Sequence, residues 1–343
     1  MILNRLGDSG LLVPQLALGT GTFGGPPYGT TSVDQAREIV ARCLDAGVTL
    51  FDSADVYGAG EAQEILGAAT EGRRDDLLIS AKVGLPMGES AALRGTGRIH
   101  LTRSVENTLR RLRTDHVDLL HLHVFDAGTP AEETVRTLDR LVADGKVRYL
   151  GVSNYAAWQL VKTQAVAEAL GAERIVSQQC YYSLVGRDFE LDLMPVGLDQ
   201  GVGTLVWSPL AGGWLTGAIR RGVPAAPGSR VDRVGAYGPP VPEEVLFAVV
   251  DVLDEIAGET GRTIPQIAIN WLLQRPTVAS VVMGADDLDQ LESNLGAVGW
   301  DLSDEQVARL DAASTTLPPY PTYMYHRDPG FTDLAPPPIR RSW

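Results

Sequence analysis

The chain is 343 residues long, 44% hydrophobic and strongly acidic, with a formal net charge of −14. This length allows one large barrel domain or two average domains, and the acidic balance disfavours general binding to nucleic acid or to anionic membranes. No apolar run reaches the length of a membrane helix and no signal peptide is evident, so we expect a cytoplasmic protein without membrane contact.

Residues 1–14 predict a β-hairpin that caps the rest of the fold. Two short segments rich in apolar residues, 2–6 and 11–13, flank the turn-forming residues 7–10. A helix is then expected from Ser32, a favourable N-cap residue that is followed three positions later by a glutamine.

Short apolar segments that read as strands recur along the chain, with helical patterns such as residues 103–111, 130–143 and 243–258 between them. The expected strands end near Thr20, Asp52, Lys82, His123, Asn154, Gln179, Ser208 and Gly284. Eight strand-then-helix units predict an α/β fold, and eight is the number of strands that closes a (β/α)8 TIM barrel.

An open, doubly wound sheet is the alternative topology, and it predicts a Gly-x-Gly-x-x-Gly turn between an early strand and a helix. Residues 19–24 match that pattern. They are followed by Gly25, Pro26 and Pro27, however, and no acidic strand end follows about twenty residues later. We therefore interpret this segment as the first loop of a barrel.

Two long loops and the tail depart from the regular spacing. Residues 84–97 are rich in Gly and Ser, and residues 216–242 are rich in Gly, Pro and Arg, so both are candidates for functional loops at the C-terminal face. We expect a single domain, with a barrel over residues 15–313. The Pro/Tyr-rich tail, residues 314–343, is expected to be non-helical and to pack over the barrel mouth.

Three successive strands end in an ionisable side chain, namely Asp52, Lys82 and His123, and Tyr57 follows the first of these strands. A phenol has a pKa near 10, and a neighbouring ammonium group favours the phenolate and lowers that pKa. Tyr57 could then exchange a proton with a carbonyl or alcohol oxygen that His123 orients, while Asp52 keeps Lys82 charged. No nucleophile paired with a base is evident, so acyl transfer is disfavoured.

A metal site is the alternative interpretation of the histidines, because His121 and His123 lie two residues apart on one face of a strand. The spacing indicates no third ligand, so we expect no metal. Cys43 and Cys180 lie in apolar segments, and two buried free thiols are favoured over a disulfide.

The four ionisable residues stand in segments that resemble the aldo-keto reductase superfamily, including its potassium-channel β-subunit-like branch. The matching segments are FDSADVYG, SAKVG, DLLHLHVFD, GKVRYLGVSNY and WSPLAGGWLTG, and the resemblance runs from about Arg5 to about Ala313. It implies a catalytic tetrad, Asp52, Tyr57, Lys82 and His123. It also implies reversible, NAD(P)(H)-dependent reduction of an aldehyde or ketone to an alcohol, with tyrosine as the general acid and base.

The resemblance also implies the residues that hold the cofactor: Gly21, Thr22, Ser153, Asn154, Gln179, Trp207, Ser208, Pro209, Leu210, Gly212, Leu215, Gly284, Asp286, Gln290 and Asn294. Many relatives have arginine at the position of Asp286, where it pairs with the 2′-phosphate of NADP. A carboxylate there suits the free ribose hydroxyl of NAD(H) instead. Gln290, Asn294 and the arginines of the loop 216–242 favour NADP(H), which we expect, with NAD(H) as the alternative.

The expected partner is a small carbonyl or alcohol substrate, bound by a monomer or homo-oligomer. By the same resemblance its contacts would be Tyr28, Val124, Phe125 and Trp158, with residues 320–325 as further candidates. The alternative function is a non-catalytic, dinucleotide-binding regulatory subunit, because channel β subunits of the superfamily also retain the tetrad.

Overall fold

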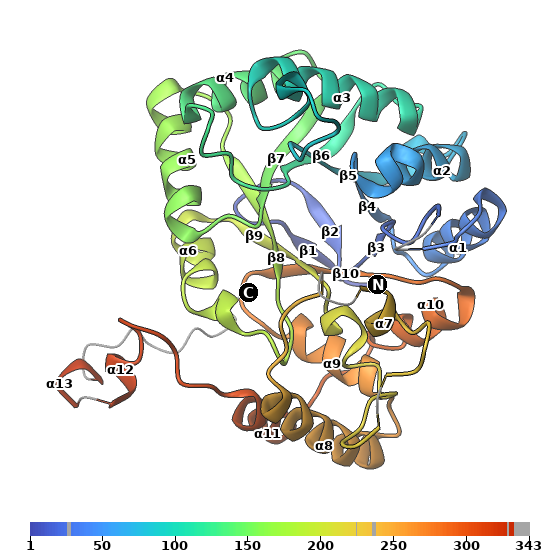
Figure 1. The fold of residues 1–343 in the computed structure, drawn as a ribbon, viewed down its shortest axis with the longest axis vertical. Helices are drawn as coiled ribbons and strands as arrows, with labels where there is room; N and C mark the ends of the chain where they lie inside the picture. The colour runs from blue at the N-terminus through green and yellow to red at the C-terminus, as the bar shows by residue number, and fades with distance from the viewer. Residues whose placement is uncertain (26–28, 224, 235–237, 328, 333–343) are drawn as a thin grey trace.

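A closed barrel forms the centre of the chain in a computed structural model, which describes residues 1–25, 29–223, 225–234, 238–327 and 329–332 (Figure 1). Its eight parallel strands follow chain order, and β10 closes the ring by pairing with both β9 and β3. The strands are β3 (Leu16–Gly19), β4 (Leu50–Ala54), β5 (Leu78–Val83), β6 (Val117–Leu122), β7 (Val147–Ser153), β8 (Ile175–Tyr181), β9 (Gly203–Trp207) and β10 (Val278–Met283). The predicted TIM barrel is confirmed, and each strand ends within two residues of its predicted end.

Helices surround the strands (Figure 1). They are α1 (Val33–Asp45), α2 (Glu61–Ala69), α3 (Arg98–Leu112), α4 (Ala131–Ala143), α5 (Ala157–Leu170), α6 (Leu193–Gln200), α7 (Arg230–Val234), α8 (Glu243–Thr260), α9 (Ile264–Leu273), α10 (Leu288–Leu295) and α11 (Asp304–Ser314). Ser32 caps α1 as predicted, and no helix follows the glycine motif at residues 19–24 directly, so that motif is the first barrel loop. Among the described helices, none is long and apolar enough to span a membrane.

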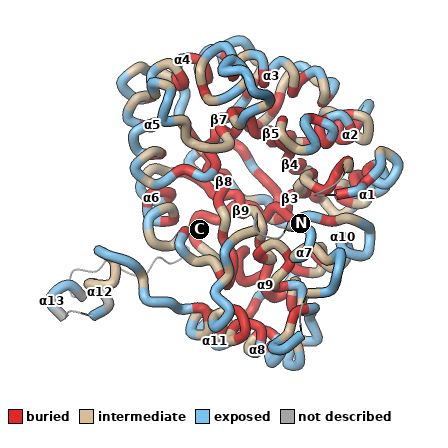
Figure 2. Tube along the Cα trace, in the orientation of Figure 1, coloured by how far each residue is buried: buried red, intermediate tan, exposed pale blue. Residues whose placement is uncertain are grey.

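The core lies between the barrel and its helices, where Figure 2 shows the strands almost entirely buried. Every residue of β4 and of β10 is buried, as expected for parallel strands that are covered on both faces. Cys43 and Cys180 are both free and buried within this core, as predicted.

The N-terminal hairpin closes one end of the barrel. Strands β1 (Leu3–Arg5) and β2 (Leu12–Pro14) pair antiparallel, and the turn between them places Asp8 N 2.8 Å from the carbonyl oxygen of Gly201, shortly before β9. The hairpin's apolar side chains join a second buried cluster with the first residue of β4 and side chains of other strands: Leu6, Leu11, Val13, Leu50, Leu119 and Leu205. The C-terminal end of the barrel is therefore the end that remains available for a ligand.

The tail differs from its prediction over the part that the structure describes. It forms two short helices, α12 (Met324–Arg327) and α13 (Pro329–Thr332), which lie beyond α11 and away from the barrel mouth (Figure 1). Its aromatic rings pair with one another, with the centroids of Tyr325 and Phe331 6.0 Å apart, while Tyr320 remains 75% exposed. The predicted non-helical cover over the mouth is therefore wrong for this part of the tail.

Candidate functional site

The predicted tetrad comes together at the C-terminal end of the barrel. Asp52 lies in β4, Lys82 in β5, and His123 directly after β6. Tyr57 begins a short 3-10 segment, Tyr57–Gly60, after β4, and its ring centroid lies 6.2 Å from that of His123. The four residues come from three neighbouring strands because parallel strands present their carboxyl ends at one face.

Asp52 and Lys82 form a buried ion pair below the tyrosine. The other oxygen of Asp52 accepts hydrogen bonds from Ser80 Oγ at 2.8 Å and from Gln179 Nε2 at 2.9 Å. Burial alone would raise the pKa of Asp52, but Lys82 reverses this shift and holds the pKa below its usual range. Burial likewise disfavours the charged lysine, yet Asp52 and the Tyr57 hydroxyl hold the pKa of Lys82 above its ordinary value. Both partners therefore stay charged at neutral pH.

The Tyr57 phenol is controlled by two opposing effects. Burial raises its pKa above the ordinary value, and Lys82, whose Nζ lies 5.1 Å from the ring centre, lowers it. Lys82 lowers the pKa as expected, but the net direction is upward, because desolvation of the phenolate exceeds the attraction of the ammonium group. Tyr57 therefore holds its proton at neutral pH and can donate it.

The two histidines of β6 have different surroundings. Burial, aided by Lys82, lowers the pKa of His123 to about 3, and its Nδ1 has no hydrogen-bond partner within the described residues. A neutral imidazole is thus available to an oxygen atom beside Tyr57. His121 instead contacts the hydroxyl groups of Ser80 and Ser177. No cluster of three metal-binding side chains occurs in the described part of the chain.

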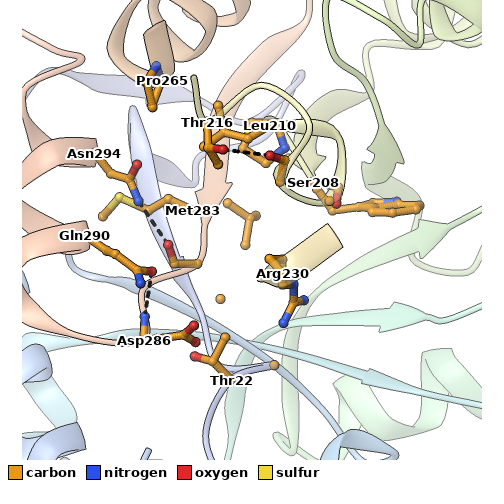
Figure 3. A pocket seen from close by; sticks show the side chains of 18 of the residues that line it. Thr22, Ser208, Leu210, Thr216, Arg230, Pro265, Met283, Asp286, Gln290 and Asn294 are labelled. Carbon is orange, nitrogen blue, oxygen red and sulfur yellow. Dashed lines mark hydrogen bonds between the residues drawn. The ribbon is translucent and has the colours of Figure 1, made fainter. Parts of the chain in front are cut away.

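Asp52 and Tyr57 line a cavity of about 620 Å³, and Figure 3 shows other residues of its wall. Most residues predicted to bind a cofactor line it, namely Gly21, Thr22, Gln179, Trp207, Ser208, Pro209, Leu210, Gly212, Gly284, Asp286, Gln290 and Asn294. Ser153, Asn154 and Leu215 are not on its wall. Ser153 and Leu215 are fully buried. The side-chain amide of Asn154 donates a hydrogen bond to the His123 carbonyl oxygen at 3.0 Å and accepts one from the Trp207 indole nitrogen at 3.2 Å.

The wall also contains Arg230 and Arg233, two of the loop arginines expected to favour NADP(H). Its other residues were not identified from the sequence as contacts: Gly19, Gly213, Thr216, Gly228, Ser229, Pro265, Ile269, Val282, Met283 and Ser293. The sequence did indicate the wall residues of the loop 216–242 as a group, because the length and the arginines of this loop predicted that it is functional. No sequence feature indicated Pro265 and Ile269, since a sequence does not show which face of α9 turns toward a cavity.

The backbone after β9 is shaped for close approach to a ligand. The φ angles of Ser208, Ala211, Gly212 and Gly213 are 52°, 51°, 69° and 108°, all in the left-handed region. Left-handed turns of this kind group backbone amides into concavities that bind anions such as phosphates. At Gly284, across the cavity, a Cβ atom would meet no atom within 4 Å, so this wall leaves open space. The geometry therefore suits a ligand that contains a pyrophosphate.

The cavity wall contains an ion pair. Arg233 of α7 contacts the Asp286 carboxylate at 2.9 Å, and about a third of each side chain is exposed. Figure 3 shows Asp286, Gln290 and Asn294 on one side of the cavity and Ser208 and Arg230 on the other. Gln290 accepts a hydrogen bond from the Asp286 backbone at 3.1 Å, and Asn294 donates to the Gly284 carbonyl at 3.0 Å. The acid at position 286 is therefore partnered by a cation.

Of the residues predicted to contact substrate, Val124, Phe125 and Trp158 lie off the cavity wall. The Phe125 ring packs between those of Tyr155 and Trp158, with centroid distances of 5.2 and 5.6 Å, and Trp158 is 61% exposed. Val124, beside Phe125, is half-buried. Tyr28 lies outside the described residues.

A buried carboxyl group that the sequence did not single out lies close to the tetrad. Asp55 is only 1% exposed, and its carboxylate has only weak contacts, with the Ser104 hydroxyl and neighbouring backbone amides. It faces a second cavity, of about 190 Å³, with His100, Ser104 and Arg111. Burial raises the pKa of Asp55 to about 7, although Arg111 lowers it. This carboxyl group therefore titrates near neutral pH, unlike an ordinary aspartate.

We expect Asp55→Asn to stabilise the protein at pH 8 and to leave its stability nearly unchanged at pH 4. The folded pKa of about 7 exceeds the ordinary 3.8, so wild-type stability declines as the pH rises through this window. The ionised form is disfavoured by up to about 4 kcal/mol, and the neutral amide avoids this penalty. Urea unfolding at both pH values measures the gain, with exposed Asp45→Asn as the control. A gain of equal size at pH 4 would contradict this account.

Comparison with known proteins places this geometry in a family. The sequence model of the Aldo/keto reductase family matches residues 15–315. The chain is 31% identical over 303 residues to the "Aldo-keto reductase YhdN" of Bacillus subtilis, an alignment that covers 88% of this chain and 89% of the relative. It is 32% identical over 317 residues to the "Uncharacterized oxidoreductase YrpG" of the same organism, with 89% and 93% covered.

A plant protein is equally similar. The "Probable voltage-gated potassium channel subunit beta" of Arabidopsis thaliana is 34% identical over 300 residues, covering 86% of this chain and 90% of the relative. The family match over most of the chain agrees with the eight-stranded barrel and with the charged cluster at its C-terminal end. The chain is therefore a member of the aldo/keto reductase family.

Proposed function

We propose that this protein is a carbonyl oxidoreductase that reversibly reduces an aldehyde or ketone to an alcohol with a nicotinamide dinucleotide. The observation that carries the proposal is the position of Tyr57 on the cavity wall, with its ring centre 5.1 Å from Nζ of Lys82 in the buried Asp52–Lys82 pair. The dinucleotide would supply the hydride, which no side chain can provide. The left-handed turns after β9 would hold its pyrophosphate.

Each tetrad residue has a role in this proposal. Tyr57 donates its proton to the carbonyl oxygen during reduction and accepts one from the alcohol during oxidation. Lys82 lowers the cost of the phenolate, and Asp52 keeps Lys82 charged. The neutral His123 hydrogen-bonds and orients the same oxygen.

The similarity to proteins named as potassium-channel β subunits supports a second candidate, a regulatory subunit that binds a dinucleotide without turnover. A turnover assay separates the two. Purified protein is mixed with NADPH or NADH and a panel of aldehydes and ketones, and absorbance of the reduced cofactor is followed. Carbonyl-dependent oxidation of the cofactor supports the enzyme. Tight dinucleotide binding without turnover across the panel would favour the regulatory subunit.

Cofactor preference is the finer part of the proposal, and we favour NADP(H), with NAD(H) as the alternative. Arg233 already neutralises Asp286, so a 2′-phosphate nearby would compete with Asp286 for the same guanidinium. Two charges about 4 Å apart near a protein surface interact by about 1–4 kcal/mol, and about 1.4 kcal/mol is a factor of ten in affinity.

We therefore expect Asp286→Asn to free Arg233 and to tighten NADPH relative to NADH by about tenfold or more. Dissociation constants for both cofactors, measured by fluorescence quenching at two ionic strengths, test this, and the effect should shrink at high salt. The matched control is Asp289→Asn, which removes the same charge from an exposed position off the cavity wall. A ratio that stays within about twofold of wild type would place the 2′ position of the ribose away from residue 286.

A further inference from the structure

Three buried polar side chains continue inward from Asp52 across the interior of the barrel. Ser80 Oγ lies 2.8 Å from Asp52 Oδ1 and 3.2 Å from His121 Nδ1, and His121 Nε2 lies 3.0 Å from Ser177 Oγ. Ser80, His121 and Ser177 are all fully buried. The residues belong to β5, β6 and β8, so the connection exists only in the closed barrel.

The chemistry of these groups fixes the direction of every hydrogen bond. Ionised Asp52 can only accept, so Ser80 uses its one proton to donate to Asp52. Ser80 must then accept from His121, which places the imidazole proton on Nδ1. Nε2 is left as an acceptor, and Ser177 donates to it. The imidazole is neutral, because burial, with a contribution from Lys82, lowers the pKa of His121 to about 3.

The neighbouring strand leaves space for this ring. His121 pairs in register with Gly151 of β7, and a Cβ atom at residue 151 would lie 2.4 Å from His121 Cδ2. Any larger residue at position 151 would displace the imidazole from both serines. The glycine thus leaves room for the histidine ring.

We propose that His121 is a positioning residue for the reaction, acting through Ser80 to hold Asp52 in place and to disperse its negative charge. Only the expected kinetic effect of this inference rests on the proposed function; the hydrogen-bond arrangement does not. A hydroxyl group that itself accepts a hydrogen bond is a stronger donor, so His121 strengthens the contact between Ser80 and Asp52. Asp52 in turn is held on its other sides by Lys82 and Gln179.

The sign of the kinetic effect follows from the charges around His121. The titratable groups nearest to His121 are Asp52 of β4, Lys82 of β5 and His123, which follows β6, and Tyr57 contacts this group. Strands β7 and β8 turn only uncharged groups toward His121. Asp52 raises the pKa of Tyr57. Loss of His121 concentrates the charge on Asp52, so the pH profile of alcohol oxidation should move to higher pH.

Two substitutions separate positioning from packing. His121→Leu fills the space without a donor, whereas His121→Asn keeps an N–H close to the position of Nδ1. We expect kcat of the leucine variant to fall about tenfold and its oxidation profile to move upward. The asparagine variant should retain kcat within about threefold and an unmoved profile. Equal profiles for wild type and the leucine variant, or equal losses in both variants, would overturn the proposal.

A second measurement does not depend on turnover. In protein labelled with ¹⁵N-histidine, the ring nitrogens of His121 are assigned by comparison with His121→Asn, since the chain has 5 histidines. We expect the proton on Nδ1, with no protonation of Nε2 from pH 5 to 9. A proton on Nε2 would refute the proposed hydrogen-bond direction, even if the enzyme turns over. A proton on Nδ1 would support that direction, even if no carbonyl substrate is found.

Discussion

Replacing Tyr57 by phenylalanine should lower kcat for carbonyl reduction by about 10²–10⁴-fold, the usual contribution of general acid catalysis. The substitution removes one hydroxyl group and keeps the ring that packs edge-on against His123 and beside Lys82. Burial keeps the phenol protonated, so the wild-type side chain can donate a proton, whereas phenylalanine has no proton donor. Steady-state kinetics and cofactor titration measure the two effects separately.

The cofactor titration shows whether the site is intact. We expect the dissociation constant of the dinucleotide to stay within about threefold of wild type, because most of the cavity wall is formed by other residues. Tyr149→Phe is the matched control, since Tyr149 packs with the hairpin cluster at the opposite end of the barrel. Retention of more than about a tenth of kcat in Tyr57→Phe would assign the proton transfer to another group.

Lys82→Met should destabilise the fold by about 3–5 kcal/mol at pH 8, because it leaves the Asp52 carboxylate buried without its cation. In wild type the pKa of Asp52 is lowered, so the pair stabilises the fold above the unfolded pKa and is lost as the pH falls. Without Lys82 burial raises that pKa, so the variant recovers stability relative to wild type as the pH is lowered toward 4. Urea unfolding at pH 5 and pH 8 measures both trends.

A double variant tests the physical cause of this loss. Asp52→Asn together with Lys82→Met removes both charges, and it should be more stable at pH 8 than Lys82→Met alone. Lys82→Met should also shift the pH profile of alcohol oxidation upward, since Lys82 lowers the pKa of Tyr57. A single variant as stable as wild type at pH 8 would mean that the pair is not the electrostatic support of the site.

The barrel and the tetrad were readable from the sequence because both depend on local patterns. Short apolar runs separated by helical patterns define alternating strands and helices, and strand ends such as Asp52 and Lys82 meet at one face in any closed parallel barrel. Ser32 began its helix as predicted because a capping box involves only neighbours in the chain.

Contacts between distant segments were decided by the tertiary structure alone. Gln179 donates a hydrogen bond to Asp52, 127 residues away in the chain, and Arg233 pairs with Asp286, 53 residues away. No local sequence spacing predicts these contacts. The net direction of the Tyr57 pKa shift also escaped prediction, because desolvation depends on how completely the surrounding strands and loops exclude water. The sequence by itself determined which chemical groups stand at the strand ends. The closed barrel decided which of them are buried, which are paired, and which can still exchange a proton, because burial and pairing depend on distances across the fold rather than along the chain.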